Sequence, residues 1–145
     1  SNTQLSGPIV AATGPSNKCE LPTDLQSSTY IRGTTLPFAE AIELVRLGRL
    51  DFLDATYAME QAERGFALDI PSSEYSPLAV DISWLDMNDT KWEADTTSLC
   101  VGCPCPGCQF MKSYVHHLFV VKEMLGPAVL TAHNLYQLRV FLSKL

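Results

Sequence analysis

Four cysteines fall within nine residues of this chain, and this crowding limits what the surrounding segment can become. They are Cys100, Cys103, Cys105 and Cys108, while a fifth, Cys19, stands alone and is expected to be a free thiol. Thiols this close along a chain do not make an ordinary disulfide framework, and the sequence opens without the pattern of a secretory signal. We therefore expect a metal site in this segment rather than disulfides.

Three of these cysteines form the pattern CxCxxC, with prolines and a glycine between them. Such a loop can turn three thiolates toward one ion, and Zn²⁺ takes four nitrogen or sulfur ligands in a tetrahedron. The fourth ligand is open from the residues alone: His133 follows at a distance, Cys100 is the local rival, and His116 and His117 are further candidates. No general base stands beside the cluster, so a structural zinc is favoured. Buried free thiols and an iron–sulfur cluster are the alternatives.

Composition excludes several classes of protein. The 145 residues are 46% hydrophobic and 18% charged, which is typical of a folded chain that needs no disulfide staples. No apolar run reaches the roughly 20 residues of a membrane span. The net charge of −6 is uneven, with −9 up to Asp95 and +3 from Thr96 onward. An acidic chain is a poor non-specific nucleic-acid binder, so only the last third suits RNA phosphates.

Hydrophobic patterning predicts four segments. Residues 1–29 are poorly patterned. Residues 30–69 predict a strand at 30–33, a helix at 36–47 and a strand at 51–55, which together make a βαβ unit with parallel strands. Residues 70–99 form an acidic insertion with short strands, in which 80–84 alternates like an edge strand and Lys91 and Trp92 are its expected partner.

The fourth segment, residues 100–145, combines the cysteine cluster with two predicted helices. The first runs over 112–125 and is expected to stop at Gly126 and Pro127; the last begins near Asn134 as its N-cap. On these helices we expect an inward-facing set that includes Tyr114, Val115, Leu118, Val121 or Phe119, Leu125, Leu135, Leu138, Leu142 and Leu145. His116 is expected to be packed and His117 exposed.

The cysteine segment resembles the zinc segment of tRNA-guanine transglycosylases, which include the eukaryotic queuine tRNA-ribosyltransferases. The resemblance rests on the CxCxxC, on the Tyr-Val-His-His-Leu run at 114–118 and on the Leu-Thr-Ala-His-Asn run at 130–134. It implies one structural zinc per chain, held by Cys103, Cys105, Cys108 and His133. The implied fold is α/β, the C-terminal portion of a (β/α)8 TIM-type barrel with an inserted zinc-binding subdomain. A whole barrel needs about 250 residues, so this chain is expected to be part of one.

A second match lies upstream. Catalytic members carry an Asp-x-Phe-Asp strand whose second Asp is the nucleophile that attacks the ribose, followed eleven residues later by a glycine. Asp51 to Asp54 and Gly65 resemble this arrangement and put Asp54 at the nucleophile position. A carboxylate suits that chemistry because it can trap an oxocarbenium-like centre.

The following residues depart from the catalytic pattern. Where that pattern has Pro-Thr-Arg, this chain has Ala58, Met59 and Glu60, and the stretch from Gln61 to Leu68 resembles the accessory, non-catalytic subunit. The resemblance thus implies an accessory subunit of queuine tRNA-ribosyltransferase, which pairs with a catalytic subunit and contacts tRNA in that complex. It also implies a cytoplasmic protein that can associate with the mitochondrial outer membrane. The alternatives are a catalytic chain with Asp54 as nucleophile, or a zinc-stabilised interaction module. An incomplete barrel is also expected to self-associate.

Overall fold

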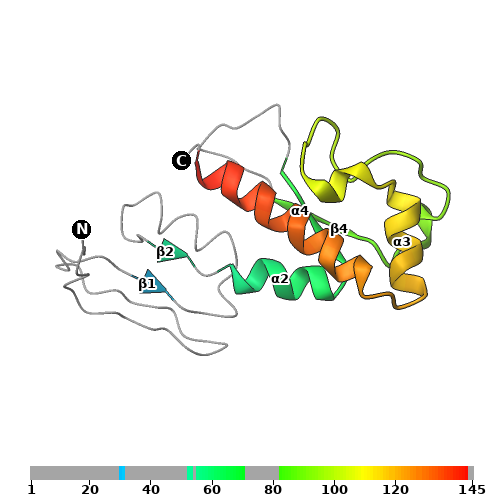
Figure 1. Ribbon diagram of the computed structural model, residues 1–145, viewed down its shortest axis with the longest axis horizontal. Helices are drawn as coiled ribbons and strands as arrows, with labels where there is room; N and C mark the ends of the chain where they lie inside the picture. Colours follow the sequence, from blue (N-terminus) through cyan, green and yellow to red (C-terminus); the bar gives the residue numbers. More distant parts are fainter. Residues whose placement is uncertain (1–29, 32–51, 54, 71–81, 144–145) are drawn as a thin grey trace. The chain divides into compact units, whose positions relative to one another are not determined.

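The structure is a computed structural model, and it describes residues 30–31, 52–53, 55–70 and 82–143. The chain divides into two compact units, residues 1–57 and 58–145 (Figure 1). Among the described residues no helix is both long enough and apolar enough to cross a bilayer.

In the first unit, two short strands lie parallel. β1 (Tyr30–Ile31) pairs with β2 (Phe52–Leu53), so that Tyr30 lies opposite Phe52 and Ile31 opposite Leu53. The parallel pairing predicted from the sequence is thereby confirmed. The predicted helix over 36–47 and the candidate nucleophile Asp54 lie outside the described residues.

The second unit combines a short antiparallel sheet with helices. In chain order it contains α2 (Thr56–Glu63) from Ala58 onward, β3 (Phe66–Asp69), β4 (Ser83–Asp86), the 3-10 turns η1 (Thr90–Trp92) and η2 (Pro106–Gln109), α3 (Lys112–Val120) and α4 (Leu125–Leu142). Neither α2 nor β3 was predicted from the sequence. Gly65 joins them with φ +92°, a backbone conformation that favours glycine.

The predicted partner of the edge strand was wrong. β4 pairs with β3, with Ala67 opposite Leu85, whereas Lys91 and Trp92 belong to η1. Local hydrogen bonds account for the difference. The Asp89 side chain accepts from the Lys91 N–H, and the Trp92 indole donates to the Asp86 carbonyl at 2.8 Å. These bonds fold the segment back into a turn.

The predicted helix boundaries near residue 125 were also wrong. α3 ends at Val120, and α4 already begins at Leu125, so Pro127 lies in its first turn rather than after the end of a helix. A proline is tolerated there because the first turn of a helix has no internal partner for its N–H groups. The chain reverses at Lys122, which has φ 58°. Asn134 lies inside α4 and is not an N-cap.

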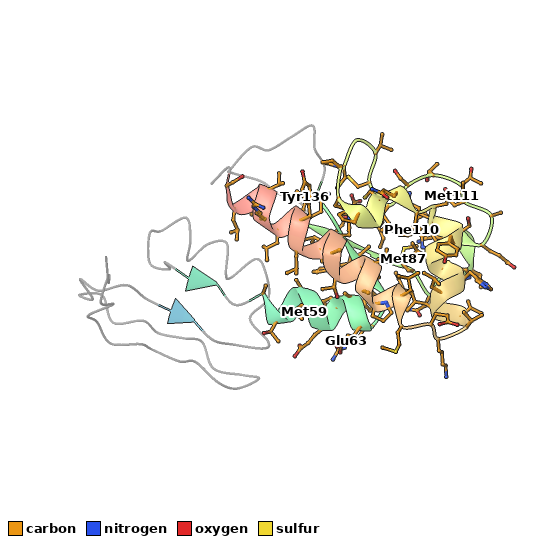
Figure 2. The ribbon with its side chains drawn as sticks, viewed as in Figure 1. Met59, Glu63, Met87, Phe110, Met111 and Tyr136 are labelled. Carbon is orange, nitrogen blue, oxygen red and sulfur yellow. The ribbon has the colours of Figure 1, made fainter. Side chains whose placement is uncertain are left out.

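The core of the second unit lies between α4, α3 and the sheet. It contains Ala62, Ala67, Met87, Leu99, Val115, Val129 and Leu130. Figure 2 shows Met59 and Glu63 on α2, both exposed, while Met87 lies among the side chains near α3 and α4. Of the residues expected to face inward, Val115, Leu118 and Leu138 are buried, whereas Tyr114, Val121 and Leu125 are exposed. The predictions for these last three were wrong. For Val121 and Leu125 the reason is that α3 ends at Val120, so neither lies on the helix face that the apolar pattern indicated.

Candidate metal centre

A tight loop presents the three cysteines of the CxCxxC pattern. Cys105 adopts an extended conformation just before η2, and the Cys108 N–H donates to the Cys105 carbonyl at 3.1 Å. Upstream, the Cys103 N–H donates to the Cys100 carbonyl at 3.3 Å. Pro106 starts η2 with its fixed φ, which suits the first position of such a turn. The loop and the short turn η2 therefore bring the three thiols toward one point.

Gly107 allows this loop to lie directly against α4. A Cβ built on Gly107 would come 2.7 Å from the Val129 carbonyl oxygen and 3.1 Å from the Cβ of His133. Real Cβ atoms do not approach that closely, and a helix carbonyl cannot turn away. Only glycine permits the observed distance between η2 and α4, and this approach places the thiols beside His133.

His133 reaches the thiols from the middle of α4. Its side chain is fully buried, and its Nδ1 lies 3.4 Å from Cys105 Sγ and 3.3 Å from Cys108 Sγ. Its other ring nitrogen, Nε2, lies 2.8 Å from the carbonyl oxygen of Leu68. A carbonyl can only accept a hydrogen bond, so in the neutral ring the proton is on Nε2. The lone pair on Nδ1 then faces the sulfur atoms.

These contacts gather four potential ligands. The Sγ atoms of Cys103, Cys105 and Cys108 and one ring nitrogen of His133 all lie within 4.8 Å of one another. A tetrahedral zinc with ordinary bond lengths separates its sulfur and nitrogen ligands by about 3.6–3.8 Å. The observed arrangement therefore fits a single ion, and three thiols with one imidazole are a donor set of structural zinc sites.

Burial governs the protonation of the group. It raises the pKa of the Cys105 and Cys108 thiols above their ordinary value, and it lowers the pKa of His133 below its ordinary value. The imidazole is thus held neutral, as a metal ligand must be, while the buried thiols stay protonated unless a cation offsets their charge. The site can hold a metal, and metal binding there would release protons.

The other residues singled out from the sequence lie outside this group. Cys100 is half-buried, and its Sγ lies 3.9 Å from the Val101 carbonyl. His116 is buried with its Nδ1 2.7 Å from the Met87 carbonyl, and His117 is exposed, so both histidines take the structural roles expected of them. Leu68 was not identified from the sequence. This residue acts through its main-chain carbonyl, which every residue type has, so no sequence pattern points to it.

Comparison with known proteins shows which family and which relatives the chain resembles. A family model described as "Queuine tRNA-ribosyltransferase" matches residues 19–145. The chain is 36% identical over 104 residues to queuine tRNA-ribosyltransferase accessory subunit 2 of Anopheles gambiae, which covers 68% of this chain and 23% of that protein. The Culex quinquefasciatus protein of the same name is 32% identical over 114 residues, covering 77% of this chain and 26% of that protein.

A bacterial relative carries a different name. The queuine tRNA-ribosyltransferase of Lachnospira eligens is 33% identical over 109 residues, which covers 74% of this chain and 25% of that protein. The chain thus spans about a quarter of the length of the curated relatives described here. The match over residues 19–145 includes the CxCxxC loop and His133, and it shows that the chain belongs to the queuine tRNA-ribosyltransferase family.

Proposed function

We propose that this chain is part of an accessory subunit of queuine tRNA-ribosyltransferase, one that pairs with a catalytic subunit during exchange of guanine for queuine in tRNA. The relatives from Anopheles and Culex bear the accessory-subunit name, while the Lachnospira relative bears the name of the enzyme. Family membership therefore does not distinguish the accessory role from the catalytic role, and individual residues must do so.

Glu60 on α2 is the residue that distinguishes the two roles. It stands where the catalytic pattern has an arginine that helps to hold the anticodon. Two residues earlier, the fully buried Ala58 stands where that pattern has a proline. A carboxylate at that point repels phosphate, whereas a guanidinium binds it with two parallel hydrogen bonds. This reversal of charge supports a subunit that does not itself hold the reacting nucleotide.

The metal in this proposal is one structural zinc per chain. Cys103, Cys105, Cys108 and His133 would hold it, and an ion with four protein ligands has no open position for a substrate. When bound, the zinc supplies folding free energy, because it ties the CxCxxC loop to the middle of α4. The chain's own contribution is the placement of the four ligands and the neutral state of His133.

The wider context is part of the same proposal and is based on the family resemblance. We assign the parallel pair of β1 and β2 to the C-terminal portion of a (β/α)8 barrel and the cysteine loop to an inserted zinc subdomain. tRNA would be contacted through the whole complex. We place the complex in the cytoplasm, with peripheral association at the mitochondrial outer membrane.

A second candidate is a catalytic transglycosylase chain with Asp54 as nucleophile. The Asp-Phe-Leu-Asp run at 51–54 and the eleven-residue spacing to Gly65 favour it, as does the enzyme name of the bacterial relative. The chemistry would be a displacement at the ribose, in which the Asp54 carboxylate forms a bond to C1′ as guanine leaves.

Co-purification tests the accessory role. The chain is co-expressed with the catalytic queuine tRNA-ribosyltransferase subunit of the same organism, with an affinity tag on one of them. We expect a complex with one copy of each, and we expect Glu60→Arg to leave that complex intact. Failure of the two chains to associate, together with guanine exchange by this chain alone, would establish the catalytic reading instead.

A further inference from the structure

β3 has one edge paired with β4 and one edge turned toward α4. The Met87 N–H donates to the Gly65 carbonyl at 2.8 Å, and Ala67 and Asp69 lie opposite Leu85 and Ser83. Backbone groups of alternate residues point to opposite edges of a strand. Phe66 and Leu68 therefore direct their N–H and C=O groups away from β4. Among the described residues no strand pairs with that second edge.

Two consecutive residues of α4 satisfy this second edge. The Asn134 side chain accepts from the Leu68 N–H through Oδ1 at 2.8 Å and donates through Nδ2 to the Phe66 carbonyl at 3.0 Å. Its amide thus takes the place of one peptide group of a neighbouring strand. Next to it, His133 donates from Nε2 to the Leu68 carbonyl at 2.8 Å. Leu68 is held by both of its backbone polar groups.

Asn134 also ties α2 into the same arrangement. Its Nδ2 donates to the Ala58 carbonyl at 3.0 Å, and its side chain is fully buried. Every buried side-chain nitrogen and oxygen in the described part of the chain has a hydrogen-bond partner. Replacement of Asn134 by an apolar residue would leave the Leu68 N–H and the Phe66 carbonyl without partners in a water-excluded place, and β3 would have to shift or rotate to recover them.

We propose that Asn134 is a positioning residue for the metal centre: by holding the backbone of Leu68, it keeps the Leu68 carbonyl where it orients the His133 ring toward the thiols. This inference rests on the proposed zinc site and deepens it. A group that hydrogen-bonds the far side of a ligating imidazole fixes both its tautomer and its ring plane. Here that group is a main-chain carbonyl, and Asn134 holds the strand that carries it.

The experiment compares metal binding by the full chain and three variants. Asn134→Leu keeps the approximate size of the side chain and removes all three hydrogen bonds. Asn134→Asp keeps an oxygen that can accept from the Leu68 N–H. His116→Leu is the matched control, because His116 is also a buried side chain that hydrogen-bonds a main-chain carbonyl, but that carbonyl belongs to Met87 and not to Leu68. Zinc affinity is measured by competition with a chromophoric chelator, and site geometry by the absorption bands of bound Co²⁺.

We expect Asn134→Leu to lose about 10–100-fold in zinc affinity and to show altered Co²⁺ bands, as happens when the groups that orient a metal ligand are removed. Asn134→Asp should lose less, and His116→Leu should keep the wild-type spectrum even where its stability falls. If Asn134→Leu keeps the wild-type Co²⁺ spectrum and zinc affinity, the positioning role of Asn134 is overturned, while the proposed zinc site stands. Equal losses in Asn134→Leu and His116→Leu would overturn it too, because the effect would then be general destabilisation.

Two further readouts keep the inference falsifiable. If Asn134→Leu does not fold, Asn134→Asp alone tests the proposal. This variant loses the two hydrogen bonds that Nδ2 donates, so wild-type zinc affinity with an unchanged Co²⁺ spectrum would contradict the proposal. In the metal-free chain, ¹⁵N NMR of the His133 ring should show the proton on Nε2, and Asn134→Asp should mix the two tautomers. A wild-type chain that binds Co²⁺ without a thiolate charge-transfer band would instead overturn the zinc site itself, and this inference with it.

Discussion

Leu68 and His133 stand 65 residues apart in the chain and are joined by a 2.8 Å hydrogen bond from the imidazole Nε2 to the main-chain carbonyl. This bond makes a strand of the small sheet part of the environment of the candidate metal centre. It leaves Nδ1 directed at Cys105 and Cys108. The following predictions test the centre, the packing that builds it and the function proposed for it.

The first prediction concerns the ligand set. Metal analysis of the purified chain should give one zinc per chain, and Cys105→Ser should abolish it and make the last third of the chain sensitive to protease. Structural zinc contributes about 10–16 kcal/mol of binding free energy in small peptide systems, so its loss is not offset by the surrounding packing. Cys100→Ser is the control and should retain the zinc. Iron in place of zinc, or metal loss in Cys100→Ser, would contradict the assigned ligands.

The second prediction concerns Gly107. Gly107→Ala should lower both the stability of the chain and its zinc affinity, because the new Cβ would meet the Val129 carbonyl at 2.7 Å and push η2 away from α4. Overpacking of this kind costs roughly 1–3 kcal/mol. Denaturant unfolding and chelator competition measure the two effects. Gly102→Asn is the control, since no atom lies within 4 Å of a Cβ at Gly102 and asparagine tolerates its positive φ.

The third prediction concerns alkaline pH. Burial raises the pKa of Cys105 and Cys108 in the folded, metal-free chain, so their stabilising contribution is complete below the ordinary thiol pKa and is lost as the pH rises above it. Under reducing conditions with chelator, the free energy of unfolding should fall between about pH 8 and about pH 10. The double variant Cys105→Ala, Cys108→Ala should show a shallower fall. Identical slopes in the two proteins would contradict the pKa directions.

The fourth prediction concerns catalysis. The chain alone should incorporate no labelled guanine into tRNA if Glu60 stands, as proposed, where catalytic members have an arginine; the chain also spans about a quarter of the length of its relatives. Filter binding of tRNA after incubation with labelled guanine measures this, with a catalytic family member as the positive control. Incorporation that Asp54→Asn abolishes would show that the chain carries its own nucleophile.

The fifth prediction concerns association. Large apolar side chains are exposed around the turn between α3 and α4, where Met124 is 88% and Val120 61% exposed, and such surfaces drive pairing. Light scattering at micromolar concentration should show a dimer or a larger assembly. The double variant Val120→Asp, Met124→Glu should shift the chain toward the monomer. A 16.0 kDa monomer in the unmodified chain would contradict the expectation of an incomplete, self-associating domain.

The sequence alone determined features that depend on residues close together in the chain. The spacing of Cys103, Cys105 and Cys108 restricts these thiols to one short loop, so a metal site could be inferred without knowledge of the fold. The parallel pairing of β1 and β2 was likewise predicted, because a strand, a helix and a strand close together in sequence have few ways to pack. The family resemblance also named His133, which the residues alone could not separate from Cys100.

Only the tertiary structure decided how distant residues meet. The helical period of 112–125 continues past the true end of α3, and Pro127 suits the first turn of a helix as well as the region after its end, so the boundary depends on packing. Asn134 is a good N-cap by its residue type, yet it lies in the middle of α4. There its amide is satisfied by Leu68, Phe66 and Ala58, contacts across 66 to 76 residues that no local pattern records. The sequence could place the thiols; the orientation of the imidazole that faces them is set by a strand it could not predict.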